Sequence, residues 1–261
     1  MQTDRVRFSA ALLVLTLSAT LLMQTSPALC AKPPVTRPLV PLQAESDATT
    51  LEDVLERALE AAGGRGSLNV LSTRVMRCRI VTDLAWDPPV HEVETLTVYS
   101  KHPDRYLIVH RSDEGTSLEG CDGTTCWKRG SDAVARVVDP PEPRSRWLTD
   151  PRFAARLDEH FPGLRLIGID YLPEGRSYVA AYDDVETHRL SFDSESGLLV
   201  RLGFNRELRD YREFDGVLLP ARVAYSRKGG SSVYYVESVD HNVPLDDALF
   251  AFPGAPARRP R

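Results

Sequence analysis

The sequence has few of the residues that build metal sites and nucleophilic active sites. Its 261 residues include 4 cysteines and 6 histidines, and these form no CxxC, HExxH or GxSxG motif. The carboxylate pairs Asp183-Asp184 and Asp246-Asp247 are typical of solvated turns rather than of an acid and base couple. We therefore expect no catalytic residue, no metal and no cofactor, although a hydrolase stays open if scattered side chains converge on folding. The scattered histidines are His91, His102, His110, His160, His188 and His241.

Positive charge is also scarce. The formal net charge is -5, and we find no basic cluster outside the termini, whereas nucleic-acid-binding surfaces are usually basic. We therefore expect no nucleic-acid partner. Hydrophobic residues make up 42% and charged residues 26% of the chain, which is ordinary for a chain that folds around a core.

Long hydrophobic runs are confined to the N-terminus. Arg5 and Arg7 precede the apolar run 9–23, and small residues follow it. This three-part pattern is typical of a secretory signal, and the run is short for a bilayer span. We expect residues 1–31 to be a cleaved signal peptide and the mature protein to be periplasmic or secreted.

Two alternative interpretations of the N-terminus stay open. An uncleaved anchor is disfavoured because Pro27 interrupts any continued helix. A lipid anchor at Cys30 is disfavoured because bulky Leu29 precedes the cysteine, where a lipoprotein signal has a small residue.

The remaining cysteines suggest a disulfide and a free thiol. Cys121 and Cys126 enclose the turn-forming tetrapeptide 122–125, and disulfides persist in exported proteins. We predict a disulfide between them across a hairpin. It would contribute about 2 kcal/mol and mainly hold the register of the two strands. Cys78 shares its strand face with apolar residues and is predicted to be a buried free thiol.

Proline and helix signals divide the start of the mature chain. Residues 32–46 are rich in proline and are predicted to be a linker. Apolar residues then recur at helical spacing over 51–62. Thr50 and Asp53 favour a capping box at its start, and Gly63-Gly64 favour a stop.

Most of the rest of the chain has strand signals separated by short turns. Short spacers require antiparallel neighbours. Residues 134–164 are less regular, and there we expect a loop followed by one short helix over about 150–160. The expected strands are 75–82, 92–100, 105–111, 116–121, 178–182, 187–192, 198–204, 208–214, 217–226 and 232–239.

This layout predicts a mainly β (α+β) fold. A sheet of roughly ten or eleven twisted strands tends to curl. The N-terminal helix and the inserted short helix each have one apolar face, and one side of the curved sheet can cover both. Curling around helices can leave an interior that side chains do not fill.

Short motifs in a set order carry a family resemblance. They are LEAAGG at 59–64, YSKHPDRY at 99–106, CDGTTCW at 121–127, FDSESGLL at 192–199, DYREFDGVLLP at 210–220 and NVPLDDALF at 242–250. Their order and spacing resemble the outer-membrane lipoprotein-sorting superfamily, the periplasmic carriers related to LolA. The Cys121 and Cys126 pair departs from the commoner hairpin residues of that superfamily.

The resemblance implies a fold and a site. The implied fold is an incompletely closed, strongly curved antiparallel β-barrel covered by helices, with an apolar cavity that accepts acyl chains. We expect residues 47–254 to be this lipid-binding domain and 255–261 to be a disordered tail. No catalytic or ligand residue is carried over by position.

The expected function is therefore to bind and carry a lipid or the acyl chains of a lipoprotein. The protein is expected to be a monomer that touches a membrane only transiently. An envelope sensor or accessory module that binds a protein partner with the same sheet is the alternative. Any of the cavity candidates could instead be plain core. They are Leu55, Leu59, Tyr99, Tyr106, Trp127, Phe153, Leu157, Tyr178, Phe192, Phe204 and Tyr211.

An empty apolar cavity is unfavourable. A void of ~300 Å³ would cost ~7 kcal/mol, which is comparable to the whole stability of a domain. We therefore expect the empty protein to collapse its helical lid, admit water or retain a lipid.

Overall fold

The computed structural model describes residues 49–85, 88–130, 134–140, 145–173, 175–182 and 188–253. The predicted signal peptide 1–31, linker 32–46 and tail 255–261 lie outside the described residues.

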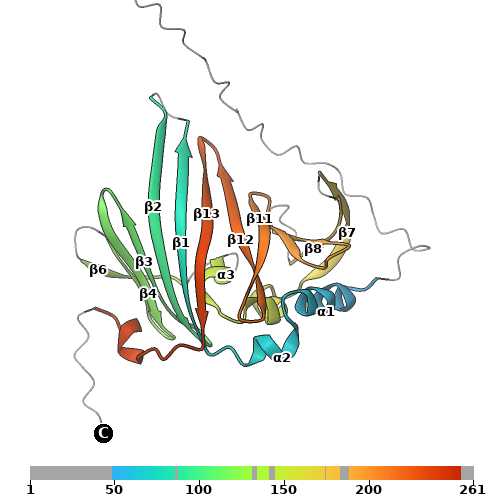
Figure 1. Ribbon diagram of the computed structural model, residues 1–261, viewed down its shortest axis with the longest axis horizontal. Coiled ribbons are helices and arrows are strands. Elements are labelled where there is room, and N and C mark those ends of the chain that lie inside the picture. The colour runs from blue at the N-terminus through green and yellow to red at the C-terminus, as the bar shows by residue number, and fades with distance from the viewer. Residues whose placement is uncertain are drawn as a thin grey trace, which may run out of the picture. The chain divides into compact units, whose positions relative to one another are not determined.

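One antiparallel sheet of thirteen strands forms the body of the described residues. Its order is β6-β5-β4-β3-β2-β1-β13-β12-β11-β10-β9-β8-β7, and Figure 1 shows these strands side by side from β6 to β7. The sheet is strongly curved and its edges do not close, as the sequence predicted. The strands are β1 (Thr73–Leu84), β2 (Val90–Lys101), β3 (Arg105–Ser112), β4 (Gly115–Asp122), β5 (Cys126–Arg129), β6 (Ala135–Val138), β7 (Arg165–Leu172), β8 (Gly175–Ala181), β9 (Arg189–Asp193), β10 (Leu199–Leu202), β11 (Arg206–Phe214), β12 (Val217–Arg227) and β13 (Gly230–His241).

The strand order requires a long crossing. The chain leaves the sheet at one edge, β6, and returns at the opposite edge, β7. The connecting segment therefore has to traverse the sheet. Its described part contains α3 (Arg146–Thr149), the 3-10 helix η2 (Phe153–Ala155) and α4 (Leu157–His160).

The prediction of one helix over 150–160 is wrong. Asp150 precedes Pro151, and proline disfavours the helical conformation in the residue before it. Asp150 accordingly ends α3 with an extended backbone, φ -105° and ψ 116°. Within 150–160, Arg156 has a non-helical backbone (φ -128°, ψ 28°), so the range forms the two short helices η2 and α4 instead of one helix.

The predicted N-terminal helix is confirmed as α1 (Leu51–Ala61). Thr50 Oγ1 accepts a hydrogen bond from Asp53 N at 3.1 Å, and Asp53 Oδ2 accepts one from Thr50 N at 2.8 Å, which completes the capping box. Gly63 has φ 124° and opens the tight turn into α2 (Gly64–Asn69). A Cβ on Gly63 would lie 2.5 Å from Gly216 O, so only glycine fits there.

Both faces of the sheet bury side chains. The inner face carries the large core, which includes Met76, Cys78 and Ile80 of β1. The outer face carries a smaller cluster in which Trp127 packs under Phe250, at the end of η3 (Asp247–Phe250). Cys78 is free and buried, as predicted.

The predicted disulfide between Cys121 and Cys126 is present. It joins β4 to β5, where the two cysteines face each other in the register. Together with the buried Tyr106, it forms a separate small cluster on the inner face.

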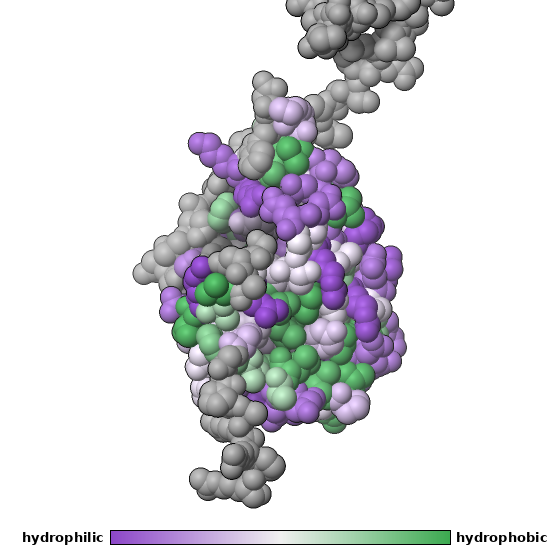
Figure 2. Space-filling view, turned by 90° about the vertical axis from the view of Figure 1, so that its left-hand side faces the viewer, coloured by the Kyte–Doolittle hydropathy of each residue, from purple (hydrophilic) through white to green (hydrophobic). Residues whose placement is uncertain are grey.

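Apolar side chains also reach the surface. Val137 of the edge strand β6 is 67% exposed and Phe204 is 50% exposed. Figure 2 shows apolar residues gathered in the lower part of the face that it views. Single exposed apolar side chains such as Val137 and Phe204 are ordinary in folded proteins. Within the described ranges, no helix has the length and hydrophobicity to cross a bilayer.

Candidate functional site

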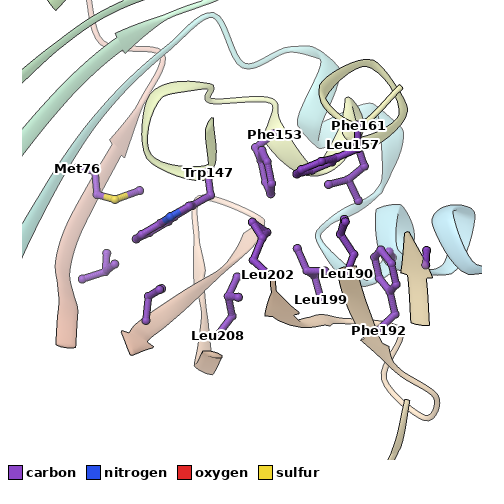
Figure 3. Close-up of a cluster of buried hydrophobic side chains, with 14 of the residues drawn as sticks. Met76, Trp147, Phe153, Leu157, Phe161, Leu190, Phe192, Leu199, Leu202 and Leu208 are labelled. Atoms are coloured by element: carbon purple, nitrogen blue, oxygen red, sulfur yellow. The ribbon is translucent and has the colours of Figure 1, made fainter. Parts of the chain in front are cut away.

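The crossing segment and α1 cover the inner face of the sheet, with α3 over strands β2 and β3 of its N-terminal half. We call α1, α3, η2 and α4 the lid. Phe153 and Leu157 of the lid point toward Leu199 and Leu202 of β10, whereas the ring of Trp147 extends away from these two leucines (Figure 3). All five side chains belong to one buried core. The lid is thus packed on the sheet by its own apolar side chains.

A small cavity remains between the lid and the sheet. Its volume is about 50 Å³, and its lining is mainly apolar. At ~24 cal/mol per Å³, an empty cavity of this size costs only about 1 kcal/mol. It has room for water molecules and not for an acyl chain. Of the three states expected for the empty protein, the structure has the one with the lid closed down.

A groove of about 300 Å³ runs along the outside of the lid, between α1 and the η2–α4 segment. Leu55 and Leu59 of α1 form one side of it. Ala154 and Leu157 line both this groove and the buried cavity. These two side chains are therefore the wall between the outside of the lid and its interior.

Arg74 is the charged residue of the cavity. It lies on β1, is 1% exposed, and donates from Nη2 to the carbonyl oxygens of Trp147 at 2.9 Å and Leu148 at 2.8 Å. Burial lowers the pKa of its guanidinium to about 10, so the group is charged at neutral pH. Arg74 ties α3 to the sheet at a point where the last turn of the helix has unpaired carbonyls.

The turn between α3 and α4 is braced by Asp150, which is buried. Its Oδ2 accepts from Arg156 Nη1 and from His160 Nε2, both at 2.8 Å, and its Oδ1 accepts from Arg152 N at 2.8 Å. Burial alone would raise the pKa of Asp150, but these hydrogen bonds and the charge of Arg156 hold it below the ordinary value. This part of the lid is internally cross-linked.

The structure brings some of the predicted cavity residues together. Phe153, Leu157 and Tyr211 line the cavity. Tyr178 and Phe192 belong to the same core. Tyr211 OH donates to Leu199 O at 2.5 Å, and burial raises its pKa.

Other predicted residues lie elsewhere. Tyr106 is on the inner face, in the disulfide cluster. Tyr99 and Trp127 are on the opposite face, packed with Phe250. Phe204 is in the exposed turn between β10 and β11.

Sequence reasoning missed Trp147, Ala154 and Arg74. Trp147 lies before the apolar-periodic stretch of the irregular segment, and Ala154 lies within that stretch but off the spacing set by Phe153 and Leu157. Arg74 could have been found, because it alternates with Met76 and Cys78 on one face of β1. In the part of the chain that the structure describes, no group of three or more His, Cys, Asp or Glu side chains is placed to hold a metal ion.

Comparisons with known proteins identify the fold. No family model matches the sequence, and no curated protein sequence matches it. A LolA superfamily protein from Nitrosomonas europaea matches in structure with a TM-score of 0.52 and 16% identity, covering 78% of this chain and 98% of that chain. A DUF1329 family protein from Desulfovibrio piger ATCC 29098 matches with a TM-score of 0.51 and 12% identity, covering 77% of this chain and 97% of that chain.

At these identities the likeness concerns the fold alone. The protein has a LolA-like fold, and the resemblance seen in the sequence motifs is confirmed at that level.

Proposed function

We propose that this protein is a periplasmic carrier that holds a lipid, or the acyl chains of a lipoprotein, between its lid and the inner face of its sheet. The proposal includes a cleaved signal peptide, a monomeric state and only transient contact with a membrane. The observation that carries it is the apolar cavity between the lid and the inner face of the sheet.

The cavity is so small that the proposed function requires the lid to open. Because about 50 Å³ cannot hold a hydrocarbon chain, the ligand has to displace the lid from the sheet. Each buried methylene then contributes about 0.8 kcal/mol, which offsets the cost of separating the apolar side chains of the lid from those of the sheet. Binding needs no specific polar partner along the chain of the ligand.

The groove between α1 and η2 is the proposed route by which the ligand enters the space beneath the lid. Its inner wall is formed by Ala154 and Leu157. Ala154 is the smallest residue of that wall, so a chain that enters there meets the least steric resistance.

Substitution of Ala154 tests the proposal. In delipidated protein titrated with the fluorescent fatty acid cis-parinaric acid, Ala154→Phe is expected to weaken binding at least tenfold, because the added ring fills the cavity. The matched control is Ala155→Phe, which adds the same ring in the groove but outside the cavity. It is expected to bind within about twofold of the unchanged protein, since the ring lies outside the space that the ligand is proposed to occupy.

Urea unfolding of both variants shows whether weaker binding comes from misfolding. Overpacking alone is expected to lower the free energy of unfolding by about 1–3 kcal/mol. Absence of saturable binding by the unchanged protein would overturn the proposal. So would equal loss in the two variants.

A further inference from the structure

A second hollow lies on the inner face of the sheet, under α3 and beside the lid cavity. Its volume is about 310 Å³, and strands β1 to β5 and β13 contribute to its lining. Ile80, Leu96 and Tyr234 form an apolar end on the central strands. Glu119 and Lys128 form a polar end on β4 and β5. The hollow therefore changes from apolar to polar along its length.

Polar and charged side chains lie close together around the hollow. Lys128 Nζ lies 3.9 Å from Glu119 Oε2, and Tyr106 OH donates to Glu119 Oε1 at 3.4 Å. His110 Nε2 lies 3.2 Å from Glu94 Oε2, and Glu94 is only 16% exposed. Groups of both signs thus stand next to each other within one site.

The pair of Glu119 and Lys128 is available to a ligand. The Glu119 and Lys128 pair is long, and the Lys128 side chain is 60% exposed, so the pair is weak and opens easily. Thr149 Oγ1, which belongs to the lining, is buried and has no hydrogen-bond partner among the residues described. Buried hydroxyls normally have a partner, and a polar ligand atom would supply one.

An aromatic contact joins the lining of the hollow to the lining of the lid cavity. Trp147 lines the cavity, Tyr234 lines the hollow, and their rings pack edge to face at 6.2 Å. Trp147 and Thr149 are both on α3, so displacement of α3 opens the two spaces to each other.

We propose that this hollow binds the polar head of the ligand, and that the head is zwitterionic. This inference rests on the proposed function, because it concerns the head of the same amphiphile whose chain the lid covers. An anionic head would be repelled by the carboxylate of Glu119, and a cationic head would be repelled by the ammonium group of Lys128. A head with both charges can pair its cation with Glu119 and its anion with Lys128, in place of the ion pair between these two residues. Electrostatic complementarity of this kind sets specificity.

Calorimetric titration with three dodecyl amphiphiles, each below its critical micelle concentration, tests the inference. The zwitterionic dodecylphosphocholine is expected to bind about tenfold more tightly than dodecyl phosphate or dodecyltrimethylammonium, which corresponds to one unfavourable charge contact. Glu119→Gln is expected to shift the preference toward dodecyl phosphate. Lys128→Met is expected to shift it toward dodecyltrimethylammonium.

Two matched controls remove the same charges elsewhere. Glu237→Gln acts on a carboxylate paired with Arg79 on the outer face, and Lys228→Met acts in the exposed turn between β12 and β13. Both are expected to keep the original order of affinities. If all three amphiphiles bind equally, or if Glu119→Gln and Lys128→Met leave the order unchanged, the head site is overturned while the carrier function stands. If none binds, the carrier function fails with it.

Discussion

At the scale of single residues, Arg74 ties the lid to the sheet. It is a buried cation whose Nη2 donates to two carbonyl oxygens of α3. Hydrogen bonds from charged donors contribute about 1.5–3 kcal/mol, and their loss leaves buried carbonyls unpaired.

Arg74→Leu is therefore expected to lower the free energy of unfolding by about 2 kcal/mol and to speed amide exchange in α3. It is also expected to raise the association rate of an acyl probe, since the lid opens more often. Hydrogen exchange followed by mass spectrometry and stopped-flow binding measure these effects. Unchanged exchange in α3 would contradict the role given to Arg74.

His241 gives the protein a specific pH dependence. Its side chain is 3% exposed, and both ring nitrogens lack hydrogen-bond partners within the described part of the chain. Burial, and next the charge of Arg74, lower its pKa to about 4 from 6.5. The fold therefore favours the neutral ring.

The stability contributed by neutral His241 is complete above pH 6.5 and is lost as the pH falls from 6.5 to about 4. The loss amounts to about 1.4 kcal/mol per pH unit and about 3 kcal/mol in total. His241→Leu is expected to remove this slope and to leave stability near pH 7 almost unchanged. Urea midpoints of both proteins between pH 7 and pH 4 measure the difference, and parallel curves would refute the assignment.

At the scale of elements, the C-terminal segment stabilises the outer face of the sheet. Phe250 is fully buried against Trp127, and Trp127 Nε1 donates to Phe250 O at 3.3 Å. Asp247 is paired with Lys101 and Arg105. The η3 turn thus closes a second core.

Phe250→Ala is expected to lower the free energy of unfolding by about 3 kcal/mol, because it removes a buried ring and leaves a cavity. Phe204→Ala is the matched control, since Phe204 is half exposed and its loss is expected to stay within about 0.5 kcal/mol. Chemical denaturation measures both. Equal losses would mean that η3 does not pack as described.

Elements with strong local signals were predictable from the sequence. The capping box at Thr50 and the apolar periodicity define α1, and the turn between Cys121 and Cys126 defines a hairpin. Strands β6 and β7 were not expected. Strand β6 has only four residues, and the register of β7 shifts between Leu166 and Gly168, which breaks the alternation that marks a strand.

The candidate site was predictable only in part. Phe153 and Leu157 were identified because apolar spacing survives in the irregular segment. Tyr99 and Trp127 were assigned to the cavity because the sequence does not tell which face of a doubly covered sheet is the inner one. Their burial comes from η3, which is distant in sequence.

At the scale of the whole described domain, the strand order explains the lid. Strands β1 to β6 and β7 to β13 form two consecutive halves that meet where β1 pairs with β13. The connection from β6 to β7 must pass from one edge of the sheet to the other. The covering of the inner face is thus a consequence of topology, and the carrier function depends on that covering being displaceable.

The chain-length dependence of binding tests this account most directly. In calorimetric titrations with alkylphosphocholines of 8 to 14 carbons, affinity is expected to rise about fourfold per methylene, the equivalent of about 0.8 kcal/mol, until the chain fills the opened space. Ala154→Phe is expected to flatten this rise. An affinity that does not change with chain length would contradict the central claim that hydrocarbon is buried beneath the lid.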